Sequence, residues 1–249
     1  MKILYSPLEQ FEIVIYWNFS FLSLDFSLTN SGFYMILVVS IIFSLFYLSL
    51  YYSFVISQQW QLLVELIYKF VLNLFIRQVG HLSALKYFPL FFCIFLFVLF
   101  SNLCSMLPFG FTVTSHILIT AFLAFFSFLG ITIRGFFFYN IHFLKIYIIS
   151  GVSPFLLPVL VIIEILSYWM RPISLSIRLF ANMLAGHTLL NIIANFSLGF
   201  FNKFFFFFFL PVFFILAVCT LELVVAFLQA YVFLNLLLIY LSDSIAMHH

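Results

Sequence analysis

The sequence RPISLSIRLFANMLAGH, residues 171–187, places two arginines, an asparagine and a histidine within about five helical turns. The surrounding run, Pro154 to Ala194, is otherwise almost wholly apolar. A charged side chain near the centre of a bilayer costs roughly 2.5 to more than 10 kcal/mol, depending on the reference state. Polar groups in such a run are therefore retained for a transport path, for a protein partner or for salt bridges between helices.

The composition excludes a water-soluble protein. Of 249 residues, 67% are hydrophobic and 6% are charged, whereas about a quarter of the residues in soluble domains are charged. The mean hydropathy of +1.31 indicates that lipid is the solvent. These values exclude a soluble enzyme and a nucleic-acid-binding protein. They predict an all-α polytopic membrane protein, because in lipid a helix satisfies its own backbone hydrogen bonds.

Three segments lack charged residues and are long enough to cross about 30 Å of hydrocarbon. Each is expected to form one transmembrane helix. A more polar segment between the first two is expected to form an amphipathic helix at the membrane surface. The three predicted spans are residues 33–57, 87–107 and 109–133, and the surface segment is residues 58–86.

Basic residues predict how these spans are oriented. The arm formed by residues 1–32 carries one lysine, segment 58–86 carries three basic residues, and segment 134–153 carries two. Basic residues in short loops favour the inner side of a membrane. The arm is therefore expected outside, and both basic segments inside.

Residues 154–195 and 204–245 are too long for ordinary spans. At 1.5 Å per residue each is about 60 Å long, twice the thickness of the hydrocarbon core. We expect a hairpin of two long, steeply tilted helices that turns at Gly199, Asn202 and Lys203. Pro172 is expected to kink the first helix. Such a tilt exceeds the usual range and requires a protein partner.

Antiparallel helices bring residues that are equally distant from their turn to the same depth. Applied to the polar residues of this hairpin, the rule predicts three levels. Arg178 and His187, nine residues apart, should lie on opposite faces and about 13 Å apart along the axis. This geometry favours two offset polar routes separated by a fixed cation over one continuous proton wire. The predicted levels are Arg178 with Gln229, His187 with Glu222, and Glu164 with Asp243.

Several runs resemble the signatures of subunit a of F-type ATP synthases. The principal ones are residues 171–187 and LELVVAFLQAYVF, residues 221–233. The match extends over essentially the whole chain and keeps the order of the motifs. Shorter matches are SPLEQFE (6–12), NLCSMLPF (102–109) and TSH (114–116).

The resemblance implies a stationary proton-channel subunit of the Fo sector, pressed against a rotating ring of c subunits. Proton flow through two offset half-channels would drive rotation and ATP synthesis. Further implied partners are other Fo and peripheral-stalk subunits and membrane lipids. The subunit would have no catalytic residues, cofactor or metal of its own. The implied roles are Arg178 as barrier and partner of the ring carboxylate, Glu222 and His187 in the outer half-channel, Glu164 in the inner one, Gln229 facing the arginine, and Asn182 and His116 as channel lining.

Two alternatives stay open at this point. One is a sodium-coupled stator, since the ring selects the ion. The other is a haem- or metal-binding respiratory subunit, although histidines level with each other on facing helices, as haem requires, do not occur. The expected location is the mitochondrial inner membrane, with the bacterial inner membrane as the alternative.

Overall fold

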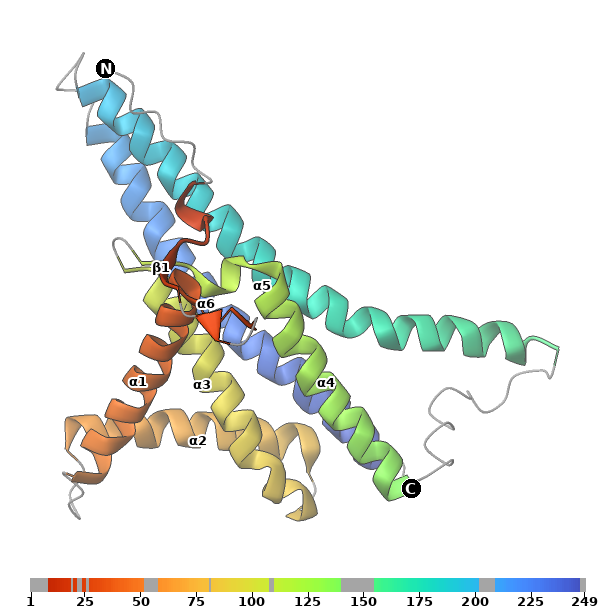
Figure 1. Cartoon of the computed structure of the whole chain (residues 1–249). Helices are drawn as coiled ribbons and strands as arrows, with labels where there is room; N and C mark the ends of the chain where they lie inside the picture. The colour runs from red at the N-terminus through yellow and green to blue at the C-terminus, as the bar shows by residue number, and fades with distance from the viewer. Residues whose placement is uncertain are drawn as a thin grey trace.

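The computed structural model (Figure 1) is a splayed bundle of helices around two long ones. The N-terminal arm is a short antiparallel ladder that leads into the first helix. The structure describes residues 9–18, 20–21, 24–25, 27–51, 58–80, 82–107, 110–139, 155–201 and 209–246. The helices are η1 (Glu9–Phe11), α1 (Asn30–Tyr51), α2 (Gln59–Val79), η2 (Leu82–Tyr87), α3 (Phe88–Ser105), η3 (Val113–Ser115), α4 (Ile117–Tyr139), α5 (Leu157–Phe201) and α6 (Phe209–Ala246).

Within the described residues, four short strands precede α1, and the sequence analysis did not predict them. β1 (Ile15–Trp17) pairs with β4 (Leu28–Thr29), and β2 (Ser20–Phe21) pairs with β3 (Leu24–Asp25), both antiparallel. The side chain of Asn191 on α5 donates a hydrogen bond to Gln10 in η1. The arm is thereby tied to the long helix, along which it lies in Figure 1.

Among the described residues, five helical segments are long and apolar enough to span a membrane. This confirms an all-α polytopic membrane protein, and the strands are too short to change the class. α2 is not among the five, in keeping with its mixed composition. It buries Val71, Phe75 and Val79, one on each successive turn, and ends at Gly80 in the left-handed conformation. The five segments are Asn30–Tyr51, Leu85–Ser105, Ile117–Phe137, Leu157–Ser197 and Pro211–Ile245.

The third span begins later than residue 109, where its prediction started. Residues before Ile117 form a hydrogen-bonded turn in which the Ser115 hydroxyl lies 2.6 Å from both the Thr112 hydroxyl and the Thr112 carbonyl oxygen. Serine and threonine side chains that bind nearby backbone compete with helix formation. At its other end, α4 continues through Arg134 to Tyr139. Residues 140–153, most of the predicted inner segment 134–153, lie outside the described residues.

The first long helix also extends further than predicted. α5 continues through Gly199 to Phe201, so Gly199 is helical and not part of the turn. One glycine costs a helix only about 1 kcal/mol, which is less than the cost of unsatisfied backbone groups in lipid. Asn202 and Lys203, the other residues of the predicted turn, lie outside the described residues. Pro172 is inside α5, which is bent in Figure 1.

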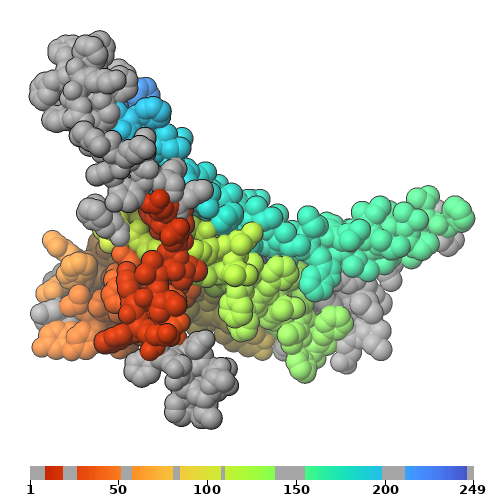
Figure 2. Space-filling model, turned by 45° about the horizontal axis from the view of Figure 1, so that its top comes forward, coloured from red at the N-terminus to blue at the C-terminus, as the bar shows by residue number. Residues whose placement is uncertain are grey.

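α6 is the element around which the bundle packs. α2, α3, α4 and α5 all contact it, and its C-terminal half supplies the most completely buried side chains. The N-terminal part of α5 extends beyond the bundle as an arm, which Figure 2 shows from another direction. The largest fully buried side chains of α6 are Phe233, Leu234, Leu237, Leu238 and Leu241.

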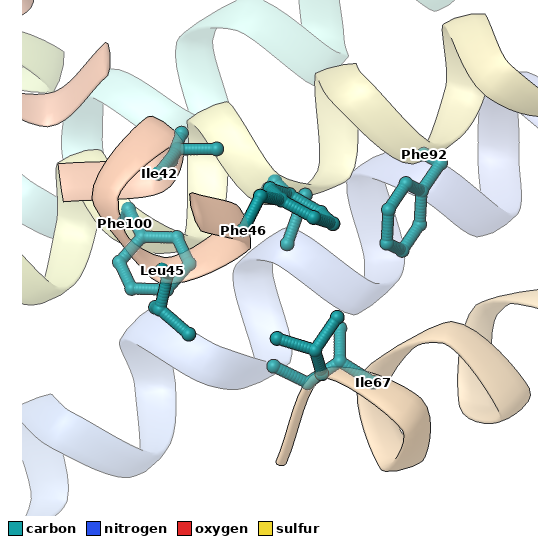
Figure 3. Close-up of a pocket in the computed structure, with 8 residues that line it drawn as sticks. Ile42, Leu45, Phe46, Ile67, Phe92 and Phe100 are labelled. Carbon is teal, nitrogen blue, oxygen red and sulfur yellow. The ribbon is translucent and has the colours of Figure 1, made fainter. Parts of the chain in front are cut away.

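α1 packs on α2 and α3, and Figure 3 shows the apolar side chains that meet at one point of this contact. Ile42 and Phe46 of α1 meet Ile67 of α2 and Phe92 of α3 around a cavity of about 10 Å³. A buried water needs about that much space and two to four polar partners as well. The lining offers no polar side chain, so this contact is dry packing and not a binding site.

Phe128 on α4 joins three helices. Its ring centroid lies 4.7 Å from that of Tyr168 on α5 and 5.8 Å from that of Tyr240 on α6.

Replacing a buried phenylalanine by alanine costs about 3–5 kcal/mol. We therefore expect Phe128→Ala to lower the midpoint temperature of thermal unfolding of the subunit in detergent. Phe137→Ala is the matched control on the same helix, because Phe137 is 82% exposed. Equal midpoints for the two variants would contradict this account of the packing.

Candidate functional site

Arg178 lies on an open face of α5. Ser174, Ala181 and Ala185, at spacings of three and four residues, are exposed on the same face. Within the described part of the chain, Arg178 takes part in no ion pair and no hydrogen bond. The helix thus presents an unneutralised guanidinium surrounded by small side chains.

His187 and Glu222 form a buried pair between α5 and α6. The Nε2 atom of His187 lies 3.3 Å from Oε1 of Glu222 and 3.4 Å from the Ser105 hydroxyl on α3. Glu222 is 3% exposed, and its carboxylate oxygens lack a hydrogen bond of good geometry to any described group. The predicted level of His187 with Glu222 is confirmed. An imidazole and a carboxylate at this distance can exchange a proton.

Gly186 makes the room that the Glu222 carboxylate occupies. A Cβ atom at Gly186 would lie 2.7 Å from Oε1 of Glu222 and 3.0 Å from its Cδ. Both distances are shorter than van der Waals contacts allow. Any larger residue at position 186 must therefore displace the carboxylate away from α5.

Gln229 was predicted to lie level with Arg178, but its hydrogen-bond partner is Asn182, about one turn further along α5. Its Oε1 atom accepts a hydrogen bond of 3.1 Å from the Asn182 side chain, which follows Arg178 by four residues. Gln229 and Glu222 are both buried on the side of α6 that faces the bundle, as their spacing of seven residues predicts. The amide of Gln229 therefore lies close to the arginine level while being bonded to Asn182.

Glu164 belongs to a charged cluster near the other end of the hairpin. Arg171 lies 3.9 Å from Glu164 and 3.7 Å from Asp243, and its guanidinium is 5.8 and 5.5 Å from the rings of Tyr168 and Tyr240. Of the roles open to charged groups in these apolar runs, a salt bridge between helices accounts for Arg171 and Asp243. Glu164 and Asp243, predicted at one level, meet through this shared arginine.

Three polar residues that the sequence reading assigned no role complete the site. Asn102 on α3 donates to the Ala226 carbonyl oxygen of α6 over 3.3 Å and accepts from the Thr114 hydroxyl over 3.1 Å. Ser105 donates to the Asn102 carbonyl oxygen over 2.6 Å. All three side chains are buried. The sequence signals for them were the short motif matches at 102–109 and 114–116 and the occurrence of polar residues in an apolar run.

His116 stands apart from this cluster. It is partly buried, and its ring stacks on Phe111 with 5.3 Å between the centroids. Its Nε2 atom is buried and finds no hydrogen-bond partner among the described residues. Burial lowers the pKa of His116, which keeps the imidazole neutral near pH 7. No described contact joins it to His187 or Glu222.

Residues 32–242 match the family model described as ATP synthase A chain. The chain belongs to the ATP synthase A chain family. It is 45% identical over 240 residues to ATP synthase subunit a of Acanthamoeba castellanii, which covers 96% of this chain and 97% of the relative. The subunit of Oenothera berteroana is 47% identical over 253 residues (98% and 90%), and that of Pelagibacter ubique is 43% identical over 247 residues (98% and 99%).

The family assignment confirms the resemblance to subunit a that the sequence motifs indicated. Members of this family are membrane subunits of ATP synthase, so the ATP chemistry belongs to other subunits. In the described part of the chain, no group of three or more histidine, cysteine, aspartate or glutamate residues could hold a metal ion. Nothing among these findings favours the haem- or metal-binding alternative.

The contact between Gly186 and Glu222 can be tested directly. We expect Gly186→Ala to displace the carboxylate and to lower passive proton flux severalfold in vesicles from which the catalytic head has been removed. Gly32→Ala is the control, because a Cβ atom there meets its nearest neighbour at an ordinary 3.7 Å. Unchanged flux in Gly186→Ala would show that proton conduction does not depend on the position of the Glu222 carboxylate.

Proposed function

We propose that this chain is the stationary proton-conducting subunit of an ATP synthase, in which two half-channels end on either side of Arg178. The observation that carries the proposal is the separation of two features on α5. A buried acid–imidazole pair, His187 with Glu222, faces the bundle, whereas the unneutralised Arg178 faces outward. Proton transfer and charge exclusion are thus divided between two faces of one helix.

Arg178 would act as the barrier between the half-channels. An arginine side chain stays protonated in proteins, so its charge is permanent. An open charge on lipid would be costly, which favours a partner that brings a carboxylate to this face. Ala181 and Ala185 beside Arg178 let another helix approach closely. A ring of c subunits, each with an ionisable carboxylate, fits this requirement.

The outer half-channel would run through the buried polar residues of three elements. Thr114 and Asn102 are hydrogen-bonded to each other, Ser105 is bonded to Asn102, and His187 lies between Ser105 and Glu222. These groups form a sequence of neighbouring donors and acceptors within an otherwise apolar bundle. Glu222 is its last titratable member and would pass the proton to the ring.

The inner half-channel would lie near Glu164. This residue precedes Arg178 by fourteen positions, or about 21 Å along α5. It is partly exposed beside Arg171 and Asp243. His187 lies on the other side of Arg178, about 13 Å away. A proton that enters at one end must therefore travel on the ring to reach the other.

The energy for rotation would come from the membrane potential. Each elementary charge that crosses 100 mV supplies about 2.3 kcal/mol, so several protons must pass for each ATP. The chain itself would contribute no catalytic residue. We propose the mitochondrial inner membrane as its location, with peripheral-stalk and other Fo subunits as further partners.

Removing the charge of Arg178 tests the barrier. We expect Arg178→Ala to abolish proton transport coupled to ATP synthesis and hydrolysis, while the complex still assembles, because the side chain lies on an open face. Arg77→Ala on α2, where the arginine is also exposed, should leave coupling intact. Full coupling in an assembled Arg178→Ala complex would refute the proposed role.

Neutralising Glu222 tests the outer route. Loss of a proton-transfer group costs about 10²–10⁴-fold in enzymes, and we expect Glu222→Gln to slow passive proton flux by at least about tenfold. Flux is measured in vesicles after removal of the catalytic head. Glu65→Gln is the control, since Glu65 is paired with Lys69 on the surface of α2. Equal flux in the two variants would exclude Glu222 from the path.

A further inference from the structure

A groove separates α3 from α4. Both helices pack against α6, but they make little direct contact with each other. Between them lies a cavity of about 560 Å³ that is open along one side. We call it the α3–α4 groove. Its walls include Leu90, Ile94 and Phe97 of α3 and Leu123, Phe126 and Gly130 of α4, and Leu241 of α6 lies at its base.

One end of the groove is positively charged. Arg134, which lines it, has its guanidinium carbon 3.9 Å from the centre of the Tyr87 ring. The ammonium group of Lys86 lies 5.3 Å from the centre of the same ring. Two cations thus gather around one tyrosine, where the second apolar span begins and the third one ends. Such a position corresponds to the level of lipid headgroups.

The rest of the groove is apolar. Among the described α4 residues that line the groove, Ser127 is the one polar residue besides Arg134. Its hydroxyl donates to backbone carbonyl oxygens of its own helix. Eleven residues separate Leu123 from Arg134, a distance of about 16 Å along α4. This is close to half of the roughly 30 Å hydrocarbon core, the depth of one leaflet.

We infer that the α3–α4 groove binds a phospholipid of the adjoining leaflet, with an acyl chain between the two helices and an anionic phosphate against Arg134 and Lys86. Length and charge together favour this occupant. A helix of another subunit would cross both leaflets, whereas the groove extends over one. Arginine binds phosphate through charge-assisted hydrogen bonds in a fork geometry. The inference does not depend on the proposed proton path, since none of its residues belongs to that path.

Photolabelling of the intact complex tests the inference. The probe is phosphatidylglycerol with a diazirine on one acyl chain, added to the purified complex in detergent, and the labelled residues are mapped by mass spectrometry. We expect label on residues 90–97 and 123–131, and competition by excess unlabelled phosphatidylglycerol. Label absent from these residues, or present but not reduced by the competitor, would overturn the inference.

Gly130 offers a way to fill the groove. A Cβ atom at this position meets nothing within 4 Å, so a large side chain can extend into open space. Gly130→Trp should reduce labelling of the groove by about tenfold or more, whereas Gly130→Ala should retain it. Undiminished labelling in an assembled Gly130→Trp complex would contradict the inference. The competition experiment on the unmodified complex remains decisive if this variant does not assemble.

The headgroup contact is tested by changing the charge. Arg134→Gln should reduce the preference for phosphatidylglycerol over phosphatidylcholine by about tenfold, while Arg134→Lys should keep most of it. An unchanged preference in Arg134→Gln would exclude the phosphate contact. Cross-links from the groove to another protein subunit in place of lipid would identify a helix as the occupant and overturn the inference.

Discussion

The cost of placing polar groups in hydrocarbon is the constraint on which the rest of this structure depends. The polar side chains of the two long helices meet it by contacting one another: His187 with Glu222, Asn182 with Gln229, and Arg171 with Glu164 and Asp243. Arg178 differs from these residues, because it lies on an open face without an ion pair to a described residue. The helix pair thus brings most of its polar groups together inside the bundle and leaves one charge open at its surface, where the proposed ring of c subunits would bear on it.

Close packing determines where the buried carboxylate can lie. Gly186 has no side chain, so α5 leaves space for Glu222 of α6, and Ser105 of α3 contacts the same Nε2 atom of His187 as Glu222 does. Three helices thus hold one acid–imidazole pair. Because α6 contacts α2, α3, α4 and α5, the same helix that carries Glu222 also supplies the buried core. The polar site and the stability of the bundle are consequently built on one element.

The lipid-facing surface is organised differently from the interior. α3 and α4 each pack on α6 and make little contact with one another, which leaves the α3–α4 groove between them open along one side. Its charged end lies near the surface and its apolar part within the hydrocarbon, so its polarity follows that of a single leaflet. A splayed bundle of this kind exposes surface that a compact one would bury, and the inferred phospholipid would cover part of it.

The sequence by itself determined the helices, the class of membrane protein and the residues of the C-terminal signatures, because hydrophobic length and periodicity are local properties. It also determined that His187 and Glu222 share a level, since an antiparallel hairpin converts distance along the chain into depth. Only the tertiary structure decided the rest. Ser105 and Asn102 come from a helix about 80 to 120 residues away in the chain, and no local pattern relates them to α5 and α6. The start of α4 at Ile117 and the helical state of Gly199 depended on competition between side-chain hydrogen bonds, backbone satisfaction and packing. Local helix propensity describes each residue separately, whereas the boundaries of α4 and α5 depend on contacts that form only in the folded chain.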